Sequence, residues 1–191
     1  PISPSYSLAG ADGLWHGLPR PGQADRAHSA LRPDGRRLDL AGWQAAWGRA
    51  LRRADRVTAF SQASRALAAA AYPELGARLR VVPHRPAALP PRLPPPPAGA
   101  RPVIGVLGNI GPHKGAAVLV ALSRRLAGSR AADLVLIGNL DPAHRLASGA
   151  RIHGSYALGD IPALVARYGI TCWLIPSIWP ETFSYTTREG L

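Results

Sequence analysis

The second half of the chain alternates short apolar runs with helix-like patterns, and this alternation limits the possible folds more than any other feature. Strands are predicted at continuous apolar runs, and helices where apolar residues recur every three or four positions. The predicted elements are strand 103–107, helix 116–126, strand 134–137, strand 151–153, helix 161–168 and strand 171–175. Apolar strands alternating with helices indicate a parallel sheet covered on both faces. We therefore expect an α/β fold containing a Rossmann-like domain with an open parallel sheet.

Local signals mark the ends of these helices. Gly128 and Gly169 are positioned to end helices, and Asp160 is positioned to cap a helix with Pro162 in its first turn. Cys172 is the only cysteine and lies in the apolar last strand, where we expect it to be buried and structural. A single cysteine excludes an intrachain disulfide and a cysteine-based zinc site.

The sequence of the first half of the chain predicts a smaller α/β unit. Residues 1–38 show no sustained period and are interpreted as loops. Asp39 is a predicted N-cap for a helix with Trp43 and Trp47 on one face. A strand at 56–60, a helix at 62–71 capped by Ser61, and a strand at 79–82 complete a strand–helix–strand unit of the kind that builds parallel sheets.

A proline-rich segment separates the two halves. Residues 83–102 include the run Pro94–Pro97 and can form neither a helix nor an inner strand. We therefore predict a partial N-terminal domain at 1–83, a linker at 84–101 and a Rossmann-like domain at 102–191. The sequence contains no run of about 18 apolar residues, so it predicts no membrane-spanning helix.

The charge of the chain bears on its partners. The formal net charge is +12, which would suit nucleic acid, anionic small molecules or a membrane surface with acidic lipids. The arginines are scattered and accompany no nucleic-acid-binding motif, so we expect no nucleic-acid partner.

Two chemical motifs follow strands of the predicted sheet. The glycine loop 108–115 contains Lys114, the only lysine, and Glu181 and Glu189 frame a segment beyond the last strand. Loops at the carboxyl ends of parallel strands lead into helix N-termini, which attract phosphate. Each motif also has an alternative without a specific function. The glycine loop could be a tight turn with a solvated lysine, and the glutamates could be two surface residues near a helix N-terminus.

A length estimate limits what the two glutamates can do together. Eight helical residues span about 12 Å, whereas the two carboxylates of a glycosidase work about 5–9.5 Å apart. The pair is therefore too widely spaced for glycosidase chemistry. Eight steps of about 100° leave both side chains on a similar side of the helix, where they could contact opposite ends of one elongated ligand.

Together these residues resemble the C-terminal, nucleotide-binding half of GT-B glycosyltransferases, in particular the retaining family 4. The similarity runs from about Ala54 to Leu191. Residues 54–61 and 80–84 resemble the end of the acceptor domain, residues 103–115 the entry loop of the donor domain, and residues 181–189 the Glu-x7-Glu motif of the family.

The resemblance implies a UDP- or GDP-linked sugar as donor, a glycan or lipid-linked acceptor, no metal ion or other cofactor, and retention of anomeric configuration. Lys114 would hold the diphosphate, with Gly111 letting the backbone approach. Glu181 would face the donor sugar as the catalytic residue. The backbone N–H groups around Phe183 and Ser184 would contact phosphate, and Glu189 would bind the ribose hydroxyls.

The chain begins at Pro1 without methionine and stops within a predicted helix, so we expect a piece of a longer polypeptide. A half-open cleft cannot exclude water, so we expect little transfer activity from this chain alone. We expect a glycosyltransferase of polysaccharide or glycolipid assembly, in the cytoplasm or peripherally at the inner face of the membrane. A nucleotide-binding module without activity and, less favoured, a basic nucleic-acid-binding segment are the alternatives.

Overall fold

The computed structural model describes the chain except for residues 1, 6–7, 85–98, 182–183, 185 and 188–191. The chain divides into two compact units. Unit 1 comprises Pro1–Arg85 and Ile178–Phe183, and unit 2 comprises Pro86–Ser177 and Ser184–Leu191. Most of the predicted linker lies outside the described residues. Each unit is described by itself below.

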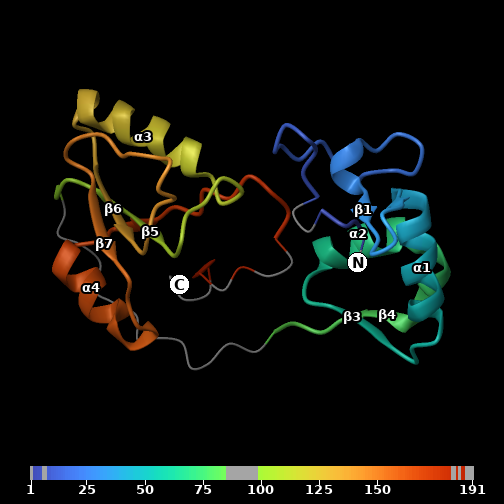
Figure 1. The fold of residues 1–191 in the computed structure, drawn as a ribbon. Coiled ribbons are helices and arrows are strands. Elements are labelled where there is room, and N and C mark those ends of the chain that lie inside the picture. Colours follow the sequence, from blue (N-terminus) through green and yellow to red (C-terminus); the bar gives the residue numbers. More distant parts are fainter. Residues whose placement is uncertain (1, 6–7, 85–98, 182–183, 185, 188–191) are drawn as a thin grey trace. The chain divides into compact units, whose positions relative to one another are not determined.

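Unit 2 is built on a four-stranded sheet in which every pairing is parallel (Figure 1). Its strands are β5 (Val103–Leu107), β6 (Asp133–Ile137), β7 (Arg151–Gly154) and β8 (Cys172–Trp173). Their spatial order is β7-β6-β5-β8. The first strand of the unit therefore lies inside the sheet, with the next two strands on one side of it and the last strand on the other. The predicted parallel sheet is confirmed.

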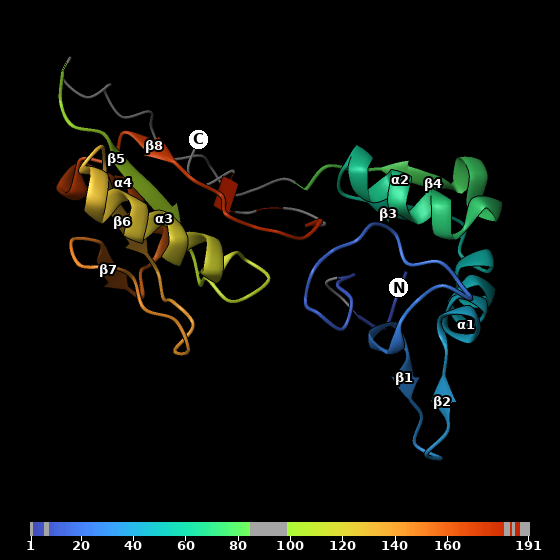
Figure 2. The same ribbon diagram turned by 90° about the horizontal axis from the view of Figure 1, so that it is seen from above.

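Helices α3 (Ala116–Ser129) and α4 (Ile161–Tyr168) cover opposite faces of this sheet (Figure 2). Side chains alternate between the faces along each strand. Val106 and Leu136 pack in the core cluster that includes α3, whereas Leu107 and Ile137 pack in the cluster that includes α4. All four of these side chains are at most 3% exposed. Strands buried on both faces read as continuous apolar runs, which is why the sequence pattern predicted them.

The helix ends show where local signals succeed and where they fail. Gly169 ends α4 in the left-handed conformation, with a φ of 64°, as predicted. Asp160 occupies the N-cap position of α4, but its carboxylate accepts a hydrogen bond from the Ala157 N–H at 3.1 Å and does not cap the helix. The prediction that Gly128 ends α3 is wrong. The helix continues to Ser129, and Arg130 turns the chain with a φ of 53°.

Cys172 is exposed, so the prediction of a buried cysteine is wrong. The reason is the position of β8. This two-residue strand pairs only with β5 and forms the edge of the described sheet. An apolar run at a sheet edge lacks the neighbour on its far side that would complete its burial.

Unit 1 contains the predicted strand–helix–strand unit. Strands β3 (Val57–Ala59) and β4 (Leu79–Val81) pair in parallel, and α2 (Gln62–Ala71) connects them. The Ser61 hydroxyl caps α2 by accepting the Ser64 N–H at 3.1 Å. Ala59 of β3 and Leu79 of β4 form a small core with Tyr72 and Leu75.

The rest of unit 1 includes a predicted helix and a hairpin that was not predicted, along with the short 3-10 helices Arg26–His28 and Pro73–Arg78. Helix α1 (Leu40–Arg52) begins after Asp39, whose carboxylate accepts the Gly42 N–H at 2.8 Å as an N-cap. Before it, β1 (Ala30–Leu31) and β2 (Arg37–Leu38) form an antiparallel hairpin within the segment interpreted as loops. Two-residue strands are too short to give a periodic sequence signal.

Within the described part of the chain, none of the helices has the length and the apolar surface that spanning a bilayer requires.

Candidate functional site

The strand order of unit 2 creates a topological switch point beside β5. The chain moves from β5 outward to β6 and β7, and then crosses back to place β8 on the opposite side of β5. In open α/β sheets, ligands bind beyond the carboxyl ends of the strands at such a reversal, because the loops from the two central strands diverge there. The loops after β5 and β8 are therefore the primary candidates for a binding site.

The loop after β5 folds into consecutive tight turns. The N–H groups of Lys114 and Ala116 both donate to the Gly111 carbonyl at 3.1 Å, and the Gly115 N–H donates to the Pro112 carbonyl at 3.0 Å. These three N–H groups are therefore used within the loop. In the first turn of α3, Ala117 and Val118 have no backbone hydrogen-bond acceptor among the described residues. Their N–H groups are the ones that this helix end can offer to an anion.

Lys114 supplies a positive charge next to this helix end. Its side chain is half-buried, and no carboxylate within the described ranges lies in ion-pair distance of its ammonium group. An ammonium group without an internal counter-ion can pair with an anionic ligand without first breaking an ion pair. Gly111 lies three residues earlier, and a Cβ at this position would meet no atom within 4 Å.

The loop after β8 lies directly against the glycine loop. Gly115 has a φ of 79°, and a Cβ at this position would overlap the carbonyl of Pro176, a buried residue after β8. Farther along the chain, Thr186 approaches the other end of the glycine loop, since a Cβ on Gly108 would lie 3.2 Å from its Cγ2. Segments that are far apart in the sequence thus meet at one edge of the sheet.

Ser184 acts locally as a helix cap. Its Oγ accepts the Thr187 hydroxyl at 2.7 Å and the Thr187 N–H at 3.4 Å, and Thr186 and Thr187 are helical. The side chain of this predicted phosphate contact is therefore engaged in the cap. A serine N-cap satisfies one of the first backbone N–H groups of a helix.

The remaining predicted site residues divide between unit 1 and the undescribed positions. Glu181 is half-buried and belongs to unit 1, whereas Lys114, Gly111 and Ser184 belong to unit 2. Phe183 and Glu189 lie outside the described residues. The structure thus assembles the lysine, the glycine loop and the segment around Ser184 within one unit.

A polar cluster that the sequence analysis missed lies at the same edge. Asn139 donates from Nδ2 to Asn109 Oδ1 at 3.0 Å and to Ser155 Oγ at 3.4 Å. These side chains follow β6, β5 and β7, and together with Gly108, Tyr156 and Leu158 they line a hollow of about 290 Å³. Each of these polar residues lies one or two positions after the end of a strand. This position in the sequence is the signal from which it could have been predicted.

The backbone beneath this cluster is fixed by hydrogen bonds that continue past the strands. The Gly108 N–H donates to the Ile137 carbonyl at 2.8 Å, and the Ile110 N–H donates to the Asn139 carbonyl at 2.8 Å. Gly138 has a φ of 135°, and a Cβ at this position would overlap the Gly108 carbonyl. The loops after β5 and β6 are therefore held together before any ligand is present.

Asp141 adds a fixed negative charge to the loop after β6. The Ala143 N–H donates to its Oδ1 at 2.9 Å, and His144 Nδ1 lies 3.2 Å from the same oxygen. The Ala143 hydrogen bond, followed by that of His144, holds the pKa of the Asp141 carboxyl below its usual 3.8. This carboxylate is ionised at neutral pH and is turned toward its own loop.

A second hollow, of about 380 Å³, lies at the opposite edge of the sheet, with Arg101 and Arg130 in its lining. Arg101 already pairs with Asp133 at 3.2 Å. The C-terminal carbonyl groups of α3 also end there, and this pole of a helix disfavours anions. The carboxyl edge of the sheet, where Lys114 and the N-terminus of α3 lie, is therefore the better place for an anion. Among the described residues, no group of three or more His, Cys, Asp or Glu side chains gathers to hold a metal ion.

No protein-family model matches this chain, and no curated protein matches it.

Proposed function

We propose that this chain binds a nucleoside-diphosphate sugar and forms part of a retaining glycosyltransferase with a GT-B fold, similar to family 4. One observation carries the proposal. The glycine loop with Lys114 and the segment after β8 meet at the switch point of a parallel sheet, where Gly115 contacts Pro176. This is where nucleotide phosphates bind in many α/β folds.

Lys114 would act on the diphosphate. During transfer the bond between the anomeric carbon and the phosphate oxygen breaks, and its electron pair moves to the departing diphosphate. An ammonium group beside that oxygen stabilises the charge that develops, and the N–H groups of Ala117 and Val118 add the positive end of α3. The acceptor hydroxyl then bonds to the anomeric carbon on the face from which the diphosphate left, and its proton passes to the departing phosphate oxygen.

The polar hollow would receive an uncharged part of the donor. The amides of Asn109 and Asn139 and the hydroxyl of Ser155 offer donors and acceptors on a prefixed backbone. Such groups suit a nucleoside or sugar, which presents hydroxyl, carbonyl and amino groups. The roles that the resemblance implies for Glu181, Phe183 and Glu189 stay predictions.

Isothermal titration calorimetry with UDP, GDP and a short oligonucleotide tests this proposal. A hydrogen bond to a charged group contributes about 1.5–3 kcal/mol, so Lys114→Ala should weaken binding of the preferred nucleotide about tenfold to a hundredfold. Arg124→Ala is the matched control, because Arg124 is an exposed cation on α3 with no ion pair among the described residues. It should leave nucleotide binding unchanged.

Two results would contradict the proposal. One is equal affinity of the parent chain and Lys114→Ala for UDP and GDP. The other is tight oligonucleotide binding that depends steeply on salt and is insensitive to Lys114→Ala, which would favour a nucleic-acid partner. Nucleotide binding without transfer is distinguished by incubation with UDP- and GDP-sugars, since release of free UDP or GDP requires cleavage of the glycosyl–phosphate bond.

A further inference from the structure

The polar hollow beyond β5, β6 and β7 lies beside the proposed diphosphate site. Asn109 lines this hollow and belongs to the same glycine loop as Lys114. A nucleoside diphosphate that is held by Lys114 can therefore place its nucleoside in the hollow. The occupation of the hollow by a base rests on the proposed function, because the diphosphate is the part that brings the ligand to this edge of the sheet.

The lining of the hollow suits a nucleobase better than a sugar. Two of its residues carry large apolar groups, the half-buried Tyr156 and Leu158, which is 59% exposed and so open to a ligand. A nucleobase has two apolar faces and a polar edge, whereas a hexose carries hydroxyl groups all around its ring. Proteins bind bases by packing side chains on the faces and by hydrogen bonds to the edge. The hollow offers both kinds of contact.

The polar groups that the hollow leaves for a ligand are mostly donors. Both N–H groups of the Asn139 side chain are used, since Nδ2 donates to Asn109 Oδ1 at 3.0 Å and to Ser155 Oγ at 3.4 Å. Within the described ranges, the side-chain N–H groups of Asn109 and the O–H of Ser155 have no acceptor. They can donate to a ligand, and Asn139 Oδ1 can accept from one.

The edge of uracil matches this set of groups. Uracil presents its N3–H between two carbonyl oxygens, so it needs one acceptor flanked by two donors. Asn139 Oδ1 can accept the N3–H, while Asn109 Nδ2 and the Ser155 O–H can donate to the carbonyl oxygens. Every polar group of the uracil edge thus has a partner in the hollow.

Guanine presents a different edge. Its N1–H and its amino group stand side by side next to a single carbonyl oxygen, and a carboxylate is the side chain that accepts from two such donors together. No carboxylate lines the described part of the hollow. The two that stand closest in the sequence are engaged elsewhere. Asp141 accepts the Ala143 N–H at 2.9 Å, and Asp160 accepts the Ala157 N–H at 3.1 Å.

We propose that this hollow selects uracil, so that the donor is a UDP-sugar rather than a GDP-sugar. The residues that determine the base are Asn109, Asn139 and Ser155. The selection comes from the pattern of donors and acceptors and not from the size of the base. Cytosine has the same single ring as uracil, but it presents an acceptor at N3 and an amino group at C4, so the hollow disfavours it as well.

Calorimetric titration of the unmodified chain with UDP, CDP and GDP tests the proposal. A buried hydrogen-bonding group left without a partner weakens binding by about fivefold to 150-fold. UDP should therefore bind at least about fivefold more tightly than either CDP or GDP. CDP is the size-matched comparison, because equal binding of UDP and CDP would show that the hollow selects a single ring and does not read its edge.

Asn139→Asp should change the preference. Asn109 and Ser155 would then donate to the new carboxylate, which leaves the uracil oxygens without donors, while the carboxylate can accept from both guanine donors. The ratio of UDP to GDP affinity should fall about tenfold or more. Asn139 is exposed, so circular dichroism should show an unchanged melting temperature.

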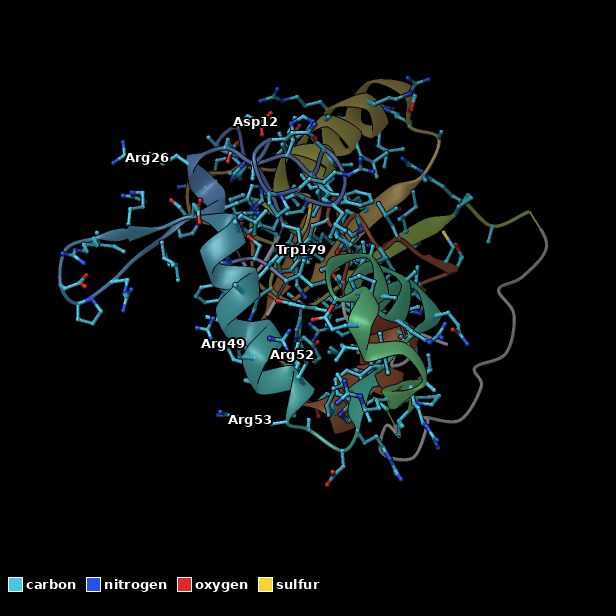
Figure 3. All side chains as sticks on the ribbon, turned by 90° about the vertical axis from the view of Figure 1, so that its right-hand side faces the viewer. Asp12, Arg26, Arg49, Arg52, Arg53 and Trp179 are labelled. Carbon is cyan, nitrogen blue, oxygen red and sulfur yellow. The ribbon has the colours of Figure 1, made fainter. Side chains whose placement is uncertain are left out.

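The matched control is Arg49→Gln, which lowers the net charge by the same one unit. Arg49 is an exposed residue of α1 in unit 1, and Figure 3 shows its side chain pointing away from the helix. It forms no ion pair within the described chain. This variant should keep the parent ratio. Lys114→Ala should also keep it, because UDP and GDP share the diphosphate and should be weakened by the same factor.

The outcomes separate this proposal from the proposed function. If UDP, CDP and GDP all fail to bind, the proposed function is wrong and the selection of uracil falls with it. If CDP or GDP binds as tightly as UDP or more tightly, the nucleotide site stands and the selection of uracil is overturned. An unchanged ratio of UDP to GDP affinity in Asn139→Asp would overturn it too.

Discussion

Two glycines bring the loops of the candidate site into contact. Gly115 and Gly138 both have positive φ, and at both a Cβ would overlap a backbone carbonyl of a neighbouring loop. A left-handed conformation costs an ordinary residue about 1 kcal/mol or more, and the overlap requires the backbone to move as well. At these two positions, glycine permits the contact between loops from different strands.

Gly115→Ala should therefore destabilise unit 2 by roughly 2–4 kcal/mol, from the left-handed backbone and the overlap with the Pro176 carbonyl combined. Gly111→Ala is the control within the same loop. Gly111 has no positive φ and has open space where a Cβ would lie. Urea unfolding followed by circular dichroism measures both variants. Equal midpoints for the two variants would contradict the described packing of the glycine loop.

At the scale of elements, a prediction agrees with the structure where its sequence signal acts over a few neighbouring residues. The starts of α1 and α2 and the end of α4 were predicted from Asp39, Ser61 and Gly169, whose effects extend over a single helical turn. The exposure of Cys172 depends on which strand forms the edge of the sheet. That order is decided by the whole domain, and a local pattern does not contain it.

The end of α3 gives a direct test at this scale. Gly128 lies inside the helix, and a Cβ there would meet no atom within 4 Å. Gly128→Ala should stabilise the chain by about 0.5–1 kcal/mol, because alanine costs less backbone entropy in a helix than glycine. Thermal unfolding measures the change, with the parent chain as reference. Destabilisation would indicate that Gly128 is the left-handed cap, as the sequence analysis had predicted.

The candidate site was predictable only in part for the same reason. Lys114 and the glycine loop stood out because they form a continuous motif after an apolar strand. Asn109, Asn139 and Ser155 are separated in the sequence and meet only because β5, β6 and β7 are neighbours in the sheet. The strand order had to be known before these three residues could be recognised as a cluster.

At the scale of the whole molecule, the residues proposed to bind the diphosphate of a sugar nucleotide belong to unit 2. The net charge of +12 suits any anionic ligand and does not identify one. Lys114→Ala and Arg124→Ala lower this net charge equally, but only Lys114→Ala should weaken nucleotide binding.

The central claim is that a nucleotide diphosphate binds at the carboxyl edge of the unit 2 sheet. Backbone amide chemical-shift mapping by NMR, with UDP and GDP titrated into the chain, tests it most directly. The claim predicts that the largest shifts fall in the glycine loop, in the first turn of α3 and at Asn139. Shifts concentrated around Arg101, Arg130 and Ser148, which line the hollow at the opposite edge, would contradict it, as would no shift with either nucleotide.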